Sequence, residues 1–329
     1  MQVLLATGLY PPEVGGPATY AKLLEERLPA RGIAVRVLPF LKVRHLPKIL
    51  RHIAYFFACL RRLSGTDVVY ALDVVSVGFP AALASMFAGK KFVVRVPGDY
   101  AWEQGRQRFG VHDELEEFQH KRYGWQVGLL RALQRFVVRR ASAVVVPSDF
   151  MKEIVSEWAN PARVHRIYSS IDEPAPMAIE RPEGFLIVSA GRKVPWKGFK
   201  ALESVVARER GWVLKICSDM PRGEMLGWIK AADVFVLNST YEGLSHTLIE
   251  AMTLGTPIVA TDVGGNPEVV GEAAILITPK DDEALYRAIK NVEQNRVGAS
   301  ARAAQGLVRA KNFSIDTAVG QLCDLLNRI

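Results

Sequence analysis

The sequence predicts an α/β protein made of two doubly wound domains that face each other. Short β-branched runs alternate with helix-period segments through most of the 329 residues, which is the rhythm of a parallel sheet covered by helices. This rhythm stops at a proline-rich stretch in the middle of the chain and then starts again. A chain of this length is also too long for one ordinary core and suits two domains.

The first domain is expected over residues 1–172. Helix-period segments separate most of its buried strands, which are predicted at 2–7, 34–40, 67–72, 91–96, 143–147 and 163–168. Residues 173–184 form the predicted linker, because the stretch "SSIDEPAPMAIERPEG" (169–184) carries three prolines and no periodicity.

The second domain is expected over residues 185–311. Its buried strands are predicted at 185–191, 212–218, 233–239, 257–262 and 273–278. A last helix is predicted within residues 312–329, with Ser314 or Asp316 as its cap. Periodicity leaves open whether this helix packs on its own domain or crosses back to the first one.

The charge is distributed unevenly between the two halves. Residues 1–172 hold 24 Lys and Arg against 15 Asp and Glu, whereas residues 173–329 hold 18 against 19. The basic excess of the first half predicts an anionic partner, either membrane lipid or nucleic acid. No nucleic-acid recognition motif accompanies it, so we expect no nucleic-acid partner.

The chain is expected to be a cytoplasmic protein. Cys59, Cys217 and Cys323 lie far apart in apolar settings, which favours reduced core thiols over a zinc site or disulfides. The N-terminal stretch lacks the basic region of a signal peptide, and the apolar run at 53–60 is too short to cross a bilayer.

The stretch "YEGLSHTLIEAMTLGTP" (241–257) holds two acids eight positions apart. A helix is predicted over 246–254, so Glu242 lies in the loop beyond a strand and Glu250 on the second turn of the helix. Ligands of doubly wound sheets bind beyond the carboxyl ends of the strands, and a helix N-terminus there attracts an anion. The predicted phosphate contacts are Gly243 and the backbone amides of Leu244, Ser245, His246 and Thr247. The two carboxylates would accept hydrogen bonds from sugar hydroxyls; the alternative is that both are ordinary surface charges.

Three separated motifs resemble those of the family 4 retaining glycosyltransferases. They are "YEGLSHTLIEAMTLGTPIVATDVGGNPEVV" (241–270), "YPPEVGGPATYAKLLEERLPARG" (10–32) and "SAGRKVPWKGF" (189–199). The resemblance implies the GT-B architecture of two Rossmann-like domains facing across a cleft. It also implies a nucleotide-diphosphate sugar as donor substrate, no cofactor, and a glycan or lipid-linked acceptor in polysaccharide or glycolipid synthesis.

The same resemblance assigns roles to individual residues. Arg192 and Lys197 match the pair that binds the donor diphosphate, with Lys193 as a competing candidate. Glu242 matches the acid near the hydroxyls of the transferred sugar, and Glu250 the acid that holds the nucleotide ribose. The glycines of the first domain that line the donor site are Gly15 and Gly16, for which an ordinary turn is the alternative. The "GGNPE" turn that ends at Glu268 is expected to support the site.

Departures from the family pattern concern the acceptor side and metal use. Where relatives often carry a histidine, "RVPGDYAWEQ" offers Asp99 as the one titratable candidate, either to orient a hydroxyl or to cap a turn. A strand and a helix common in relatives are missing between residues 218 and 226. No D-x-D pair is present, so we expect a metal-independent reaction in which cationic side chains meet the leaving-group charge. Retention is implied to proceed through an oxocarbenium-like transition state.

Residues 42–62 form a basic segment, with six Lys and Arg and no acid. They contain a predicted amphipathic helix, whose apolar stripe either docks on anionic membrane lipid or packs on the sheet while its basic side faces water. Both can hold together, with the stripe packed in the core and the charges weakly attracted to the inner membrane face. Residues 99–125 are interpreted as a loop or lid on the acceptor side.

Two other functions remain open on this sequence. One is a nucleotide-sugar epimerase, and the other is a non-catalytic nucleotide-sugar-binding protein with the same two-domain plan. The sequence does not determine the donor base, the donor sugar, the acceptor or the oligomeric state.

Overall fold

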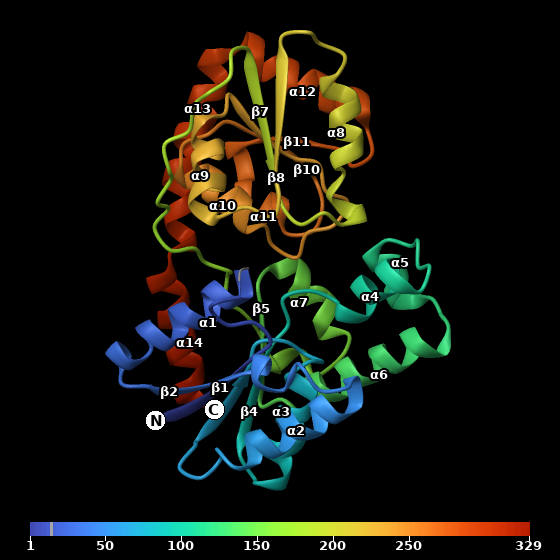
Figure 1. The fold of residues 1–329 in the computed structure, drawn as a ribbon, viewed down its shortest axis with the longest axis vertical. Helices are drawn as coiled ribbons and strands as arrows, with labels where there is room; N and C mark the ends of the chain where they lie inside the picture. Colours follow the sequence, from blue (N-terminus) through green and yellow to red (C-terminus); the bar gives the residue numbers. More distant parts are fainter. Residues whose placement is uncertain (14–15) are drawn as a thin grey trace. The chain divides into compact units, whose positions relative to one another are not determined.

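The computed structural model describes residues 1–13 and 16–329, apart from the side chain of Lys48 (Figure 1). The chain divides into two compact units. Unit 1 contains Met1–Tyr168 together with Ile315–Ile329, and unit 2 contains Ser169–Ser314. The predicted fold class, two doubly wound α/β domains, is confirmed by one parallel sheet in each unit.

Unit 1 is built on a parallel sheet of six strands. In spatial order the strands are β2 (Ala34–Pro39), β1 (Gln2–Thr7), β3 (Val68–Ala71), β4 (Lys91–Arg95), β5 (Ala143–Val146) and β6 (Val164–Arg166). All six lie within the predicted ranges. The spatial order changes direction between β1 and β3, so the carboxyl ends of these two strands flank the crevice where a doubly wound sheet binds ligands.

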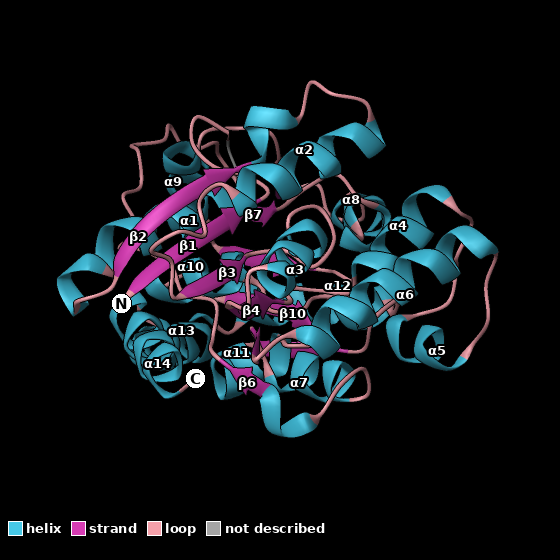
Figure 2. Cartoon of the chain, turned by 90° about the horizontal axis from the view of Figure 1, so that it is seen from below, coloured by secondary structure: helices cyan, strands magenta, loops and turns pink. Residues whose placement is uncertain are grey.

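Helices cover both faces of the unit 1 sheet. They are α1 (Gly16–Arg27), α2 (Lys48–Leu60), α3 (Gly78–Phe87), α4 (Tyr100–Arg108), α5 (Leu115–His120), α6 (Trp125–Arg140), α7 (Asp149–Ser156) and α14 (Ile315–Arg328). Figure 2 shows α14 on one side of this sheet and α3 and α6 on the other.

The helix α14 belongs to the core of unit 1, although it follows unit 2 in the sequence. Leu322 is fully buried in one cluster with Val3 and Leu5 of β1 and Leu24 of α1. The apolar stripe that the sequence shows in its last helix therefore packs on the first sheet.

Unit 2 is built on a parallel sheet of five strands. In spatial order the strands are β11 (Ile275–Ile277), β10 (Ile258–Thr261), β9 (Val234–Leu237), β7 (Phe185–Ala190) and β8 (Trp212–Cys217). Its helices are α8 (Phe199–Val206), α9 (Arg222–Ala231), α10 (His246–Thr253), α11 (Asn266–Val270), α12 (Asp282–Gln294) and α13 (Arg296–Ala310). Here the spatial order changes direction between β7 and β9.

The proline-rich stretch precedes β7 and contains no helix or strand between residues 172 and 184. It is not a free tether, because the Met177 amide donates to the Gly223 carbonyl oxygen over 2.9 Å. A side chain at Gly227 would meet the Met177 carbonyl oxygen at 2.3 Å. The stretch is thus packed on α9 of unit 2.

The orientation of α2 differs from that of an ordinary domain helix. Its apolar residues Ile49, Leu50, Ile53 and Phe57 are 76%, 53%, 48% and 52% exposed. The buried side instead carries Tyr55, whose hydroxyl donates to the Leu38 carbonyl oxygen over 2.6 Å. The reading in which the whole stripe packs on the sheet is therefore wrong for these four residues.

The three cysteines are buried and free, as the sequence predicts. Burial raises the pKa of the Cys59 thiol to about 12 and that of Cys217 to about 11. Both are therefore protonated, unreactive core residues at neutral pH. In the part of the chain that the structure describes, no helix has the length and apolar character needed to span a bilayer.

Candidate active site

The loops that follow β7 and β9 form the candidate site in unit 2. They lie where the spatial order of the strands changes direction, so the polar groups after both strands converge at one edge of the sheet. A hydrogen bond from the Thr240 amide to the Trp196 carbonyl oxygen, 2.8 Å long, joins the two loops. The loop after β7 carries Lys197, and the loop after β9 carries Glu242. Both are predicted site residues.

Lys197 and Glu242 form an ion pair in this place. The Lys197 ammonium lies 2.6 Å from Oε1 of Glu242, and the side chains are 12% and 11% exposed. The Ser239 hydroxyl donates to the same oxygen over 2.6 Å. Oε2 accepts no hydrogen bond from the described residues, so the carboxylate is held in position with one oxygen available to a ligand.

Glycines allow close approach on both sides of this contact, one in the β7 loop and two in the turn after β10. Gly191 has φ +149°, and a Cβ there would lie 3.0 Å from Cε of Lys197. Gly264 has φ +53°, and a Cβ there would lie 2.0 Å from the Glu242 carbonyl oxygen. The Gly265 amide donates to that oxygen over 3.0 Å. The "GGNPE" turn thus packs directly under the Glu242 loop.

The helix α10 begins as predicted, with Ser245 as its N-cap. The Ser245 hydroxyl accepts a hydrogen bond from the Leu248 amide over 3.4 Å and lies 3.0 Å from the Thr247 hydroxyl. Gly243 and Leu244 are buried, whereas His246 and Thr247 are partly exposed. The N-terminus of α10, which carries the positive pole of the helix dipole, therefore lies beside Glu242.

Glu250 is the second acid of the motif, and it is only 4% exposed. Its Oε1 accepts a hydrogen bond from Nε of Arg222 over 2.9 Å. Burial raises the pKa of the Glu250 carboxyl, while the Arg222 charge opposes this shift. The surface-charge alternative is thus excluded for both acids, since Glu242 is also only 9% exposed.

Arg222 was not predicted from the sequence. It is the first residue of α9 and lies in the segment "SDMPRGE" (218–224), which follows β8. A cation at the start of a helix that follows a strand is a weak signal, because such residues are mostly exposed. Only the fold brings Arg222 to Glu250, 28 positions away.

Arg192 lies in the loop after β7 and is exposed, as is Lys193. Neither forms an ion pair with any residue that the structure describes. Arg192 is thus near Lys197 along the chain but is not held in the Lys197–Glu242 contact. Within the described residues, no group of three or more His, Cys, Asp or Glu side chains is placed to hold a metal ion.

Asp99 is occupied as a helix cap and is fully buried. One carboxylate oxygen accepts from the Trp102 amide over 3.0 Å and from Gln134 over 2.9 Å. The other accepts from Gln119 over 2.8 Å. Of the two predicted roles, this geometry corresponds to the cap, so we assign Asp99 to the structure of unit 1 and not to substrate contact.

A different acid, Asp73, lies at the edge of the unit 1 sheet where β1 and β3 end. It is partly buried, and its Oδ1 accepts from the Val77 amide over 3.0 Å. A Cβ at Gly8 would lie 2.6 Å from its Oδ2. Burial raises the pKa of the Asp73 carboxyl, although hydrogen bonds from backbone amides of residues 75–78 oppose the shift.

Asp73 was not predicted as a site residue, although it directly follows a predicted strand in "YALDVV". Of the two glycines expected nearby, Gly15 lies outside the described residues. Gly16 is the exposed first residue of α1, and a Cβ there would meet nothing within 4 Å.

Family comparison agrees with this architecture. A model of the glycosyl transferase 4-like domain matches residues 2–169, half of the chain. The chain belongs to this glycosyltransferase family. A model of the group 1 glycosyl transferases matches residues 214–306, which contain both acids of the candidate site.

Curated relatives are similar to this chain over part of their length. The O-antigen chain mannosyltransferase B of Escherichia coli is 32% identical over 133 residues, which cover 36% of this chain and 35% of that protein. The MMP α-(1→4)-mannosyltransferase of Mycolicibacterium hassiacum is 29% identical over 209 residues, or 52% of this chain and 51% of that protein. The matched segments thus span from about a third to a half of these relatives.

Solved structures show the fold over the whole chain. Sucrose-phosphate synthase from Thermosynechococcus elongatus superimposes with a TM-score of 0.81 at 17% identity, over 99% of this chain and 98% of that one. Anabaena HepE in complex with UDP-glucose gives a TM-score of 0.71 at 17% identity, over all of both chains. The fold is that of the GT-B glycosyltransferases.

Proposed function

We propose that this chain is a retaining, metal-independent glycosyltransferase. It transfers a hexose from a nucleotide-diphosphate sugar to a glycan or lipid-linked acceptor in the synthesis of a surface polysaccharide or glycolipid. The observation that carries the proposal is the pair of ion pairs, Lys197–Glu242 and Arg222–Glu250, around the start of α10. Mannosyltransferases among the relatives support hexose transfer, and the UDP-glucose complex of HepE supports a nucleotide-sugar donor.

In the proposed site, the donor diphosphate lies at the first turn of α10. Lys197, Arg192 and the amides of residues 243–247 stabilise the charge that grows on the diphosphate as the sugar C1–oxygen bond breaks. Glu242 uses its available oxygen to hold hydroxyls of the transferred sugar. Glu250, oriented by Arg222, accepts hydrogen bonds from the ribose hydroxyls.

Retention follows from chemistry on one face of the sugar. The acceptor oxygen bonds to C1 on the side from which the diphosphate leaves, and the acceptor proton passes to the departing phosphate oxygen. No protein nucleophile is needed, so the protein positions the substrates and stabilises charge. Asp73, and not Asp99, takes the acceptor-side role: its carboxylate packs against Gly8, where a Cβ would meet Oδ2, and orients the acceptor hydroxyl.

The exposed stripe of α2 supports a further part of the proposal, contact with an anionic membrane. Ile49, Leu50, Ile53 and Phe57 face outward. Phe87 of α3 is 78% exposed, and its ring lies 5.7 Å from that of Phe56. Apolar side chains next to an acid-free basic segment fit a bilayer with anionic head groups, which would bring the enzyme to lipid-linked acceptors at the inner face.

The decisive experiment is an assay with radiolabelled UDP- and GDP-sugars and a membrane lipid extract, in the presence of a chelator. Label in lipid or glycan is the expected result for wild type and for the control variant Glu272→Gln, whose glutamate is exposed. A Glu242→Gln/Glu250→Gln variant should lose donor affinity and turnover. Altered free nucleotide sugar would instead identify an epimerase, and binding without turnover a receptor.

A further inference from the structure

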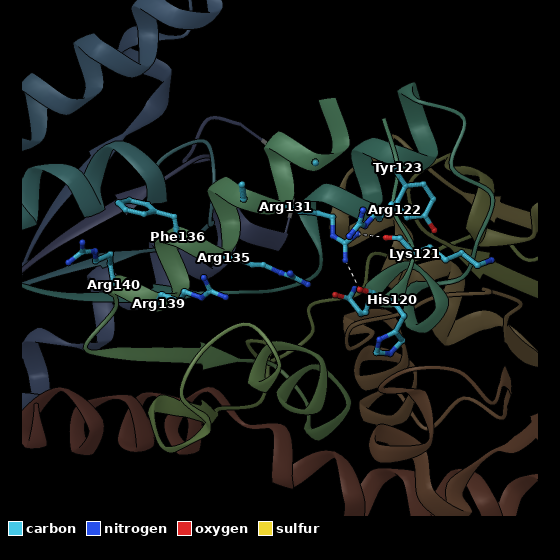
Figure 3. A pocket seen from close by; sticks show the side chains of 12 residues that line it. His120, Lys121, Arg122, Tyr123, Arg131, Arg135, Phe136, Arg139 and Arg140 are labelled. Carbon is cyan, nitrogen blue, oxygen red and sulfur yellow. Dashed lines mark hydrogen bonds between the residues drawn. The ribbon is translucent and has the colours of Figure 1, made fainter. Parts of the chain in front are cut away.

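A basic groove lies in unit 1, outside the candidate active site. It has a volume of about 820 Å³ and runs along α6 beside the segment 119–123. Six cationic residues line it (Figure 3): Lys121, Arg122, Arg131, Arg135, Arg139 and Arg140. We call it the α6 groove.

The positive charge of the α6 groove is largely uncompensated. Residues 118–148 contain these six Lys and Arg and no Asp or Glu. Lys121 is paired with Asp113, 2.5 Å away, but none of the five arginines forms an ion pair with any described residue. A concave surface with one sign of charge concentrates its field and attracts ligands of the opposite sign.

Two of the arginines are fixed by hydrogen bonds to the backbone. Arg131 donates to the carbonyl oxygens of Lys121 and Gln119 over 2.6 and 2.5 Å. Arg139 donates to the Trp158 carbonyl oxygen over 3.0 Å. Since the long side chains are held in place, little rotamer entropy is lost when they bind a ligand.

Arg135 lies between them, one helical turn from each. Successive members of the row 131, 135 and 139 are separated along the helix axis by about 6 Å, and Figure 3 shows their side chains following one another along α6. Arg135 forms no hydrogen bond with the described residues, and its Nε is buried. Burial and then the Arg135 charge lower the pKa of Arg131, so the two guanidinium groups repel each other in this state.

We propose that the α6 groove binds the phosphate or diphosphate group of a phosphorylated ligand. A phosphate carries more charge than a carboxylate and accepts paired N–H donors from several guanidinium groups at once. Placed at Arg135, whose side chain is partly exposed, it accepts hydrogen bonds from the guanidinium group and offsets the repulsion from Arg131. The groove is much larger than one phosphate, so the rest of the ligand also fits along α6.

One residue of the groove contacts the cap of α4 at the carboxyl end of the unit 1 sheet. Gln119, which lines the groove, donates to Asp99 over 2.8 Å, and Asp99 caps α4 just beyond β4. The carboxyl end of the sheet is where ligands of this fold bind. Resting on the proposed function, we infer that the phosphorylated ligand is the acceptor, held by its phosphate while its hydroxyl reaches the sheet edge.

The test is calorimetric titration of the full chain with inorganic pyrophosphate, without metal. The variant is Arg135→Gln/Arg140→Gln, because neither side chain donates a hydrogen bond to a described residue and the fold should survive, which thermal unfolding verifies. The matched control, Arg61→Gln/Arg108→Gln, removes two exposed charges of unit 1 whose side chains likewise donate no hydrogen bond to a described residue. Since pyrophosphate also resembles the donor diphosphate, all three chains are repeated with Lys197→Gln.

In the Lys197→Gln background we expect saturable binding that the groove variant weakens at least about tenfold, the loss of one or two charge-assisted hydrogen bonds. The control pair should change it less than about twofold. No saturable binding, or an equal loss in the control pair, would overturn the proposal. The titration involves no donor and no turnover, so its failure is distinct from failure of the transferase assay.

The source of the phosphate is then found with two probes. One is vesicles of phosphatidylcholine containing phosphatidate, and the other is soluble glucose 1-phosphate. A groove variant that loses vesicle binding relative to the control pair identifies a lipid head group. One that loses only glucose 1-phosphate binding identifies a soluble phosphorylated glycan. Loss of neither would overturn the proposal.

Discussion

The Glu250 carboxyl is buried, and burial disfavours its ionised form. It is 4% exposed, and its one partner among the described residues, Arg222, is partly in solvent. Burying a carboxylate is unfavourable unless several groups compensate it. A glutamine would fill the same space with less loss of hydration, and the proposed ribose contact gives a reason for a charged acceptor at this position.

Replacing Glu250 by glutamine should therefore separate stability from binding. Donor affinity should fall by about 10- to 100-fold, since a hydrogen bond to a charged group contributes about 1.5–3 kcal/mol. The free energy of unfolding at neutral pH should stay equal or rise. Donor titration and urea unfolding measure the two effects, and a less stable variant with unchanged affinity would contradict this role.

The pH dependence of stability has a defined sign for Glu250. Because its pKa is raised in the folded chain, the folded state holds this proton more tightly than the unfolded state does. Its contribution to stability thus falls as the pH rises from the ordinary glutamate pKa to the raised one. Unfolding of wild type and Glu250→Gln across this interval should show the difference between them growing with pH, then constant above it. A difference that shrinks would contradict the assignment.

The contact of Lys197 with Glu242 should appear as non-additive kinetics. Lys197→Gln alone should lower turnover by about 100- to 1,000-fold, the effect of removing one group that stabilises developing charge. The double variant with Glu242→Gln should lose less than the product of the single losses, with a coupling of about 0.5–3 kcal/mol. The measurement is kcat/KM for the four chains. Additive losses would mean that the two side chains act separately.

At the scale of elements, α2 has its apolar residues on the solvent side. An ordinary surface helix turns such a stripe inward, whereas here the inward positions are taken by Tyr55 and Cys59. An exposed apolar stripe of this kind marks an interaction surface. The six Lys and Arg of residues 42–62 are the reason for proposing an anionic membrane as the partner.

Polar replacements on this stripe should weaken membrane binding without unfolding the chain. We expect Ile53→Ser/Phe57→Ser to lower sedimentation with phosphatidylglycerol vesicles at least about tenfold, because each buried side chain contributes about 1.5–3 kcal/mol. The control is Val297→Ser/Val308→Ser, which changes two residues of α13 that are 83% and 67% exposed. Equal binding of both variants, or equal binding to phosphatidylcholine, would refute membrane docking by α2.

At the scale of the whole molecule, the chain returns to its first unit for its last helix. Leu322 of α14 is fully buried beside residues of β1 and α1. Unit 1 is therefore completed only after unit 2 has been made. Its stability depends on a segment nearly 150 residues downstream of Tyr168.

Shortening Leu322 should thus destabilise unit 1 selectively. Leu322→Ala should lower its free energy of unfolding by about 2–5 kcal/mol. Hydrogen exchange should show the loss of protection in β1 and β3, with β7 and β9 unchanged. Leu307→Ala is the control, since Leu307 of α13 is 45% exposed. Loss of protection confined to unit 2 would contradict this division of the chain.

Local patterns were sufficient for much of this protein. The sequence predicted all eleven strands, because buried parallel strands are short apolar runs bounded by turns. Cap chemistry located the start of α10 at Ser245. The order of motifs along the chain, read from the family resemblance, indicated the family and the two acids of the site.

Only the tertiary structure decided which groups meet. Arg222 reaches Glu250, Asp73 lies against Gly8, and the arginines of α6 line one groove, because folding joins positions whose separation in sequence carries no signal. The direction of the α2 stripe and the place of α14 were equally undetermined, since periodicity gives an apolar face but not what covers it. The elements and their chemistry could be predicted from local sequence, whereas the neighbours of each element depend on packing in three dimensions.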